Sequence, residues 1–204
     1  MKPPATTVGE IMAGAVWALM RVMREKDLHT FQHMVCVRDV AVAMGRILVL
    51  SPNDMDILEY ASALHDIGKL SVPARILCKP SRLSQTEWSI MCLHPEAGAR
   101  ILNEIPFPGR VSEVVLQHHE RCDGSGYPKG LSGKDILPET RIVMVADVYC
   151  AMSEGRPYRP ALPMERIEEE LVGNGSASYD SDVVNALLRL KPVLRSRKTY
   201  LPFR

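Results

Sequence analysis

The chain has 204 residues, a formal net charge of +1, and hydrophobic and aromatic fractions of 46% and 5%. This length fits one large domain, and the apolar fraction is enough to bury a real core. A nearly neutral chain has no overall field to attract a nucleic acid polymer or a membrane surface, so any preference for anions must come from a local patch. Frequent Ala, Leu and Met with few strand-favouring runs indicate an all-α fold.

The cysteines and the N-terminal stretch bear on the cellular compartment. Five cysteines, odd in number and widely spaced, include no Cys-x-x-Cys pair. This pattern predicts reduced thiols in a cytoplasmic protein rather than a disulfide framework, with each Cys a small buried apolar residue. The apolar stretch from Ile11 to Met20 follows Glu10 and is too short to span a bilayer. We therefore expect no signal peptide and no membrane segment.

The first part of the chain predicts three helices. Residues 8–26 carry apolar side chains at helical spacing, and a second helix is expected over residues 30–50. Ser51-Pro52 is a typical start for the third helix, with Ser as the N-cap and Pro in the first turn. We separate residues 1–26, as a linker or a homodimer contact, from a domain formed by residues 27–204.

Proline and glycine interrupt the later part of the chain. Residues 71–81 predict a loop with one short helical turn, and residues 123–138 an ordered loop. Ser84 to Glu87 is a capping box that should start a helix toward His94. Further helices are expected after Pro95 through Leu102, and over residues 111–120, 141–153, 164–172 and 181–190. The expected architecture is a compact bundle of about seven to nine helices.

Residues 63–69, Ala-Leu-His-Asp-Ile-Gly-Lys, place an imidazole beside a carboxylate near the end of an apolar helix. A buried carboxylate is costly unless a cation meets it, and His with Asp suits Fe, Mn or Zn. If the helix continues, Lys69 lies one turn beyond His65 on the same face and offers a positive charge to a phosphate. The alternative is a capped helix end with a solvated His, Asp and Lys.

The six histidines lie mostly at or near helix ends or breaks. A lone His is more often structural, but the adjacent pairs His65-Asp66 and His118-His119 weaken that interpretation. Seven groups are candidate metal ligands: His33, His65, Asp66, His94, His118, His119 and Asp147. One octahedral ion takes six ligands at most, so these groups fit two ions about 3.5–4 Å apart, bridged by Asp66 and by a nucleophilic hydroxide. His29, one turn before His33, is a candidate ligand of a third ion or a residue at the rim.

Several motifs follow one another in order along residues 27–190. They are Thr30-x-x-His33; His65-Asp66-Ile67-Gly68-Lys69; Leu77 to Pro80 with Leu83 and Glu87; His94 with Gly98; His118-His119-Glu120-Arg121; Asp123 to Pro128; Arg141; Ala146-Asp147; Arg156-Pro157-Tyr158-Arg159; and Tyr179-Asp180. In this series the chain resembles the HD-GYP family, the branch of the HD superfamily of metal-dependent phosphohydrolases that cleaves cyclic di-GMP. The resemblance implies an all-α bundle of the HD-domain type with the metal site in its core.

The resemblance also implies roles for the matching residues. The seven candidate groups would be the metal ligands, and His29 stands where family members with three metals have an acidic ligand. Asp66 and Lys69 would be the catalytic residues, with Lys69 in contact with the scissile phosphate. Arg156 and Arg159 would hold phosphate of the dinucleotide, since a guanidinium fork matches phosphate oxygens.

The loop Gly126-Tyr127-Pro128 would lie near the site. Tyr127 is expected among the substrate-binding residues, and the loop is a candidate docking surface for diguanylate cyclase domains. The alternative is that the loop has turn chemistry alone, because Gly supplies positive φ and Pro fixes φ.

Cys150 departs from the family pattern. The family usually reads Ala-Asp-x-x-Asp-Ala, and here the second Asp is Cys150, one turn after Asp147. We place Cys150 among the substrate-binding positions and expect the change to leave the metal centre intact but to weaken guanine recognition or alter nucleotide preference. A free thiol beside a metal site could also be oxidised.

The sequence therefore predicts a metal-dependent phosphodiesterase that hydrolyses cyclic di-GMP to pGpG, and to GMP after a second cut. The expected cofactors are two or three divalent cations, with iron ranked first and manganese second. Two alternatives stay open: a weakly active or inactive cyclic di-GMP sensor that docks cyclase domains, and an HD phosphohydrolase for another cyclic dinucleotide.

Overall fold

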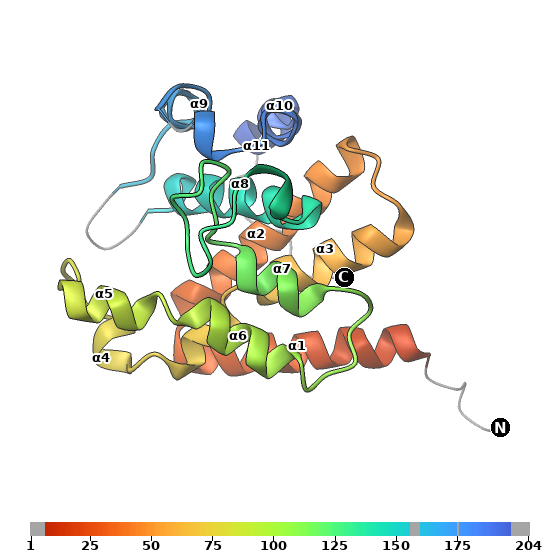
Figure 1. Cartoon of the computed structure of the whole chain (residues 1–204), viewed down its shortest axis with the longest axis vertical. Helices are drawn as coiled ribbons and strands as arrows, with labels where there is room; N and C mark the ends of the chain where they lie inside the picture. Colours follow the sequence, from red (N-terminus) through yellow and green to blue (C-terminus); the bar gives the residue numbers. More distant parts are fainter. Residues whose placement is uncertain (1–6, 156–159, 175, 197–204) are drawn as a thin grey trace.

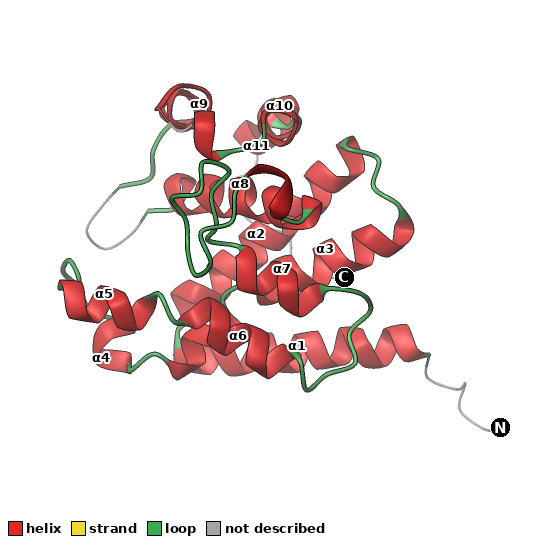
Figure 2. Ribbon diagram, in the orientation of Figure 1, coloured by secondary structure: helices red, strands yellow, loops and turns green. Residues whose placement is uncertain are grey.

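The computed structural model describes residues 7–155, 160–174 and 176–196. The regular segments in these ranges are all helical, and Figure 2 draws no strand among them. Eleven segments in the described ranges are α-helices, and eight of these have seven residues or more. The predicted all-α class is therefore confirmed. The α-helices are α1 (Val8–Lys26), α2 (Leu28–Ile47), α3 (Pro52–Leu64), α4 (Ala74–Leu77), α5 (Gln85–Met91), α6 (His94–Leu102), α7 (Val111–Gln117), α8 (Pro138–Ser153), α9 (Met164–Glu168), α10 (Ser181–Arg189) and α11 (Lys191–Ser196).

Side-chain caps start two of the helices where the sequence places them. Ser51 accepts a hydrogen bond from the backbone N–H of Asp54 at the start of α3, with Pro52 in the first turn. Ser84 and Glu87 form the predicted capping box at the start of α5. Each cap satisfies a backbone donor that has no partner inside its helix. These starts could be predicted because the signals are local.

α2 is the central helix of the bundle. It packs against α1, α3 and α8, and Figure 1 shows α1 along one side of the molecule and α9 and α10 on the opposite side. Met34 and Met44 of α2, Leu58 of α3 and Val143 of α8 are fully buried in one apolar cluster. Removing this surface from water is the main force that holds the helices together. The bundle thereby fixes the faces of α2, α3 and α8 relative to one another.

α1 is built into the same core. It packs on α2 and α3, and its Val16, Met20 and Met23 belong to the common apolar cluster. The boundary between residues 1–26 and 27–204 and the role of a homodimer contact stay predictions.

Several helix ends differ from the sequence-based boundaries. α2 ends at Ile47 because Val49 adopts a left-handed φ of 55°. α7 ends at Gln117, whose carbonyl accepts the Glu120 N–H as the chain turns. α9 has five residues and continues as a π-helix over Glu169–Asn174. The short helix α11 was not predicted.

The structure also corrects the prediction about the cysteines. Cys36 of α2 and Cys150 of α8 form a disulfide across 114 residues of sequence, so the expectation of reduced thiols is wrong for this pair. Cys78, Cys92 and Cys122 are not disulfide-bonded. The spacing of the cysteines along the chain does not by itself reveal this pairing, which depends on the packing of α2 against α8.

Candidate metal centre

The candidate ligands come from helices that are far apart in sequence and meet in the core. His33 lies on α2 and Asp147 on α8, and His94 is the first residue of α6. His65 and Asp66 directly follow α3, and His118 and His119 directly follow α7. At a helix end the backbone can turn, so adjacent residues there can face one target.

Six of the seven candidate ligands form two groups, each with its ligand atoms within 4.8 Å of one another. The first group is Asp66, His94, His118 and His119, and the second is His33, His65 and Asp66. Asp66 belongs to both groups, as a carboxylate that bridges two cations would. The seventh candidate, Asp147, contacts the second group, because its Oδ1 lies 2.8 Å from Nε2 of His33.

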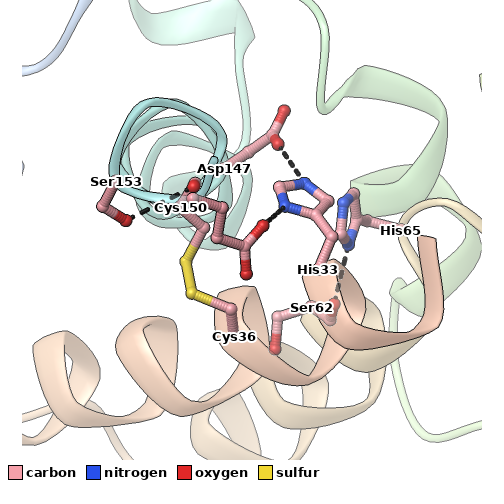
Figure 3. The surroundings of a disulfide bond; sticks show 8 residues. His33, Cys36, Ser62, His65, Asp147, Cys150 and Ser153 are labelled. Carbon is pink, nitrogen blue, oxygen red and sulfur yellow. Dashed lines mark hydrogen bonds and ion pairs between the residues drawn. A yellow bond between two sulfur atoms is a disulfide. The ribbon is translucent and has the colours of Figure 1, made fainter. Parts of the chain in front are cut away.

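Three of the histidines are oriented by the same local contact. Nδ1 of His65, His94 and His118 lies 2.8, 2.8 and 2.6 Å from the backbone carbonyl oxygen three residues earlier. A carbonyl oxygen only accepts, so Nδ1 carries the proton and Nε2 presents a lone pair. Figure 3 shows this contact between His65 and Ser62. Metal-binding histidines are commonly fixed in this way by a partner of their second nitrogen.

The lone pairs of these histidines point into the space around Asp66. Nε2 of His94 lies 3.2 Å from Nε2 of His118, and two such acceptors repel each other unless a cation joins them. Nε2 of His65 is buried and has no hydrogen-bond partner among the described residues. Burying an unpaired polar atom is costly. The donor set therefore fits divalent cations that accept mixed nitrogen and oxygen ligands.

Asp66 lies between the two groups and is 1% exposed. Its Oδ1 faces Nε2 of His94 at 3.3 Å and of His118 at 3.9 Å. Its Oδ2 faces Nε2 of His65 at 3.5 Å and Nζ of Lys69 at 2.6 Å. Burial alone would raise the pKa of Asp66, but the charge of Lys69, together with the contacts with His65 and His94, outweighs burial and holds the pKa well below its usual range. The carboxylate is thus ionised at the centre of the site.

Burial keeps three of the imidazoles neutral. It lowers the pKa of His65, takes that of His118 well below its usual range, and brings that of His119 to about 3. Desolvation disfavours the charged form, and the neutral imidazole is the form that binds a metal. These side chains therefore need to lose no proton at neutral pH to act as ligands.

His33 has a different environment, because a carboxylate faces each of its nitrogens. Nε2 contacts Asp147 and Nδ1 lies 3.1 Å from Oε2 of Glu154. Burial lowers the pKa of His33, but the hydrogen bonds to Asp147 and Glu154 outweigh it and raise the pKa to about 9. Glu154 was not among the predicted site residues. It is the C-cap residue of α8 and follows Asp147 by seven residues, about two helical turns, a spacing that could have indicated it.

Gly68 sets the distance between Asp66 and His94. The 3₁₀ helix Ile67–Ser71 packs against α6, and a Cβ on Gly68 would lie 1.9 Å from the backbone carbonyl oxygen of His94. Only glycine permits this approach. The same short helix carries Lys69, whose Nζ lies 2.6 Å from Oδ2 of the candidate ligand Asp66.

Glu120 anchors the loop that follows α7. The side chain is 1% exposed, and its two oxygens accept hydrogen bonds from the backbone N–H groups of Lys129 at 2.7 Å and Leu131 at 2.9 Å. Gly126 passes so close that a Cβ would lie 2.4 Å from Cα of Glu120. The ring of Tyr127 stacks on His119 with centroids 4.8 Å apart. The Gly126-Tyr127-Pro128 loop therefore covers one ligand of the candidate centre.

A cavity of 340 Å³ opens beside these ligands. His119 and Asp147 line it together with the aromatic rings of Trp88, Tyr127 and Tyr179. Trp88 is 53% exposed and meets Tyr127 edge-on, with ring centroids 6.5 Å apart. Polar candidate ligands and aromatic rings therefore line the same cavity, a combination that suits a ligand with both polar groups and flat rings. Trp88 was not among the predicted site residues.

Three further predictions have different outcomes. His29 is half-buried on α2 and belongs to neither ligand group. Arg156 and Arg159 lie outside the described residues. Cys150 is fully buried and bonded to Cys36, so it is not a free thiol, and its side chain offers no surface to a nucleotide. Its assignment to the substrate-binding residues is corrected by this burial.

Comparison with known proteins places this site in a family. The profile of the HD domain family, described as "HD domain", matches residues 18–183. The chain therefore belongs to the HD domain family, and the resemblance to its HD-GYP branch is confirmed. No described helix has the length and apolar character needed to cross a membrane.

Two curated relatives and one solved structure illustrate the similarity. The chain is 38% identical over 173 residues to the cyclic di-GMP phosphodiesterase response regulator RpfG of Xanthomonas campestris, covering 84% of this chain and 46% of that protein. It is 34% identical over 175 residues to 3'3'-cGAMP-specific phosphodiesterase 2 of Vibrio cholerae, covering 85% and 34%. The HDG"Y"P protein Bd1817 of Bdellovibrio bacteriovorus shares the fold, with a TM-score of 0.65, 22% identity, and coverage of 80% and 52%. The chain thus spans less than half the length of these two curated relatives.

Proposed function

We propose that the chain is a metal-dependent phosphodiesterase domain that hydrolyses a cyclic dinucleotide, with cyclic di-GMP as the first candidate. The observation that carries this proposal is the position of Asp66, whose two oxygens face two separate groups of imidazoles. Such a pair of sites, bridged by one carboxylate, is typical of hydrolases that act on phosphate esters. The names of the relatives support the same substrate class.

The residues of the site have different roles in the proposed reaction. Two bound divalent cations would supply charge neutralisation and an activated water at neutral pH. Asp66 and the histidines hold fixed positions that need no rearrangement during the reaction. Lys69, which pairs with Asp66 at 2.6 Å, is within reach of a phosphate oxygen at the same place and would neutralise its negative charge. Arg156 and Arg159 are proposed to hold phosphate of the dinucleotide.

The cavity favours a nucleotide over a simple phosphate ester. Trp88, Tyr127 and Tyr179 present aromatic faces next to His119 and Asp147. Base stacking on such rings contributes about 1–3 kcal/mol per base and tolerates different bases. The linear product pGpG, and GMP after a second cut, are the products that we propose for cyclic di-GMP.

Asp66→Ala tests the proposal. Protein purified without oxygen should contain iron or manganese by elemental analysis and should convert cyclic di-GMP to pGpG, resolved by chromatography. Asp66→Ala should lose both the metal and the turnover, because the bridging ligand of both groups is gone. Turnover by this variant at the parent rate would refute the mechanism.

A second substrate is favoured by three relatives that are named as 3'3'-cGAMP-specific phosphodiesterases of Vibrio cholerae. Cyclic GMP-AMP should therefore be assayed beside cyclic di-GMP under the same conditions. A higher kcat/KM for cyclic GMP-AMP would replace the first candidate and keep the reaction class.

A further inference from the structure

The disulfide Cys36–Cys150 lies one helical turn from the metal centre on both of the helices that it joins. Cys36 follows His33 by three residues on α2, and Cys150 follows Asp147 by three residues on α8. Residues three apart on a helix share a face, so each Cys lies beside a candidate ligand. Figure 3 shows the disulfide and the His33–Asp147 contact crossing the same gap between the helices.

We propose that this disulfide is a covalent clamp that positions His33 and Asp147 for one of the two cations, and that its reduction by a dithiol weakens the binding of that cation. The inference rests on the proposed metal centre. Cys36 and Cys150 are positioning residues in this scheme, since they act through the helices and touch no substrate.

The disulfide joins the two helices whose spacing sets the distance between the candidate ligands His33 and Asp147. His33 and Asp147 come from α2 and α8, and their ligand atoms are 2.8 Å apart. The Cα atoms of the two cysteines are 6.1 Å apart, so the covalent link limits how far α2 and α8 can separate at this turn. A cation site loses affinity when the groups that orient its ligands are removed, typically by about 10–100-fold.

The other group of ligands does not depend on this link. His94, His118 and His119 come from the ends of α6 and α7, and Asp66 follows α3. None of these residues lies on α2 or α8. The clamp should therefore affect one cation and leave the other almost unchanged, which distinguishes it from a general loss of stability.

The redox step is an ordinary thiol–disulfide exchange with a dithiol reductant. One thiolate of the dithiol attacks one sulfur of the Cys36–Cys150 bond and forms a mixed disulfide. Its second thiolate then displaces the remaining Cys, so the dithiol becomes a disulfide and Cys36 and Cys150 become thiols. Two electrons and two protons pass to the protein. Because both cysteines are fully buried, the exchange requires a local opening of the α2–α8 contact.

The test compares cation binding in the oxidised protein and in two variants that cannot form the link, Cys36→Ser/Cys150→Ser and Cys36→Ala/Cys150→Ala. Intact mass and thiol counting establish the disulfide in the parent protein. Competition of Mn²⁺ with a coloured chelator, without any nucleotide, then gives the affinity of each of the two sites. The matched control is Cys78→Ser/Cys122→Ser, which removes two cysteines that are not disulfide-bonded.

The expected result is that one of the two Mn²⁺ affinities falls by at least about tenfold in both double variants, while the other affinity stays at the parent value. The control variant should keep both parent affinities. Brief treatment of the parent with a dithiol should have the same effect as the double substitutions of Cys36 and Cys150, and reoxidation should reverse it. Equal affinities for both cations in the parent and both variants would overturn the clamp, as would two free thiols at these positions in the air-oxidised parent. Failure to cleave a cyclic dinucleotide would overturn only the proposed function, because this assay contains no substrate.

Discussion

At the scale of single residues, His33 differs from the other buried histidines because a carboxylate faces each of its nitrogens. The pKa of His33 is about 9, whereas that of His119 is about 3. A cation that binds His33 below pH 9 must therefore displace a proton, and a cation that binds His119 displaces none above pH 3. The affinity for a cation should therefore depend on pH differently in the group that contains His33 and in the group that contains His119.

We predict that uptake of the cation at His33 releases one proton at pH 7. The apparent affinity should rise about tenfold per pH unit up to about pH 9 and then level off, because His33 loses its proton there. Calorimetry of Mn²⁺ binding in buffers with different heats of ionisation measures the released proton directly. No proton release from either site at pH 7 would contradict the assignment of His33 as a ligand.

A variant at Glu154 tests whether the pKa of His33 sets this pH dependence. Glu154→Gln keeps the size of the side chain but removes the charge of one of the two hydrogen-bonded carboxylates that raise the pKa of His33. The affinity of that site should then level off at a lower pH than in the parent. Glu169→Gln is the control, since Glu169 is exposed and pairs with Arg166 away from the centre.

At the scale of elements, the buried carboxylate of Glu120 helps to hold the loop after α7, together with backbone hydrogen bonds from Cys122 and Tyr127. Its two oxygens accept the N–H groups of Lys129 and Leu131. Gln offers one acceptor oxygen in place of two, so Glu120→Gln should leave one of these buried donors unpaired, at a cost of about 1–3 kcal/mol. Hydrogen exchange of residues 123–131 should become faster while α2 and α3 keep their protection.

The same variant should raise the KM for the dinucleotide more than it lowers kcat. Tyr127, which stacks on His119 and lines the cavity, is carried by this loop, whereas Asp66 and Lys69 are not. Unchanged exchange rates in residues 123–131 would show that Glu120 does not anchor the loop.

The helices and loops also show which features of the structure could be predicted from the sequence and which could not. The helix start at Ser51 and the capping box at Ser84 were predictable because their partners lie within three residues. The convergence of His33, Asp66 and Asp147 was predictable from chemistry, since these groups are costly to bury without a shared cation. Once that convergence was assumed, the residues one turn further on α2 and α8 should also have been placed together, and these are Cys36 and Cys150.

Other contacts had no local signal. Trp88 of α5 reaches the cavity only because the chain folds back, with Lys79 paired to Glu87 at 2.6 Å next to it. The hydrogen bonds from the loop to Glu120 span nine and eleven residues of irregular backbone. Such contacts depend on the tertiary arrangement, and neither periodicity nor spacing indicates them.

At the scale of the whole molecule, the candidate ligands connect α2, α3, α6, α7 and α8, which also carry most of the apolar core. Cations held between these helices bind the folded chain and not the unfolded one. Their binding free energy therefore adds to the free energy of unfolding, by about 2.7 kcal/mol per site when the free cation is at 100 times its Kd. For a chain of this size this corresponds to a rise in Tm of about 5–11 °C per site.

We predict that a chelator lowers the Tm of the parent protein by about 5–11 °C for each site that it empties and that excess Mn²⁺ restores the Tm. Asp66→Ala should show neither shift, because the ligand shared by both groups is absent, although its own Tm is free to differ from that of the parent. Differential scanning calorimetry with and without chelator measures both. If the parent melts at the same temperature in either condition, the imidazoles and carboxylates of these five helices hold no cation, since a ligand of the native state alone must raise its stability.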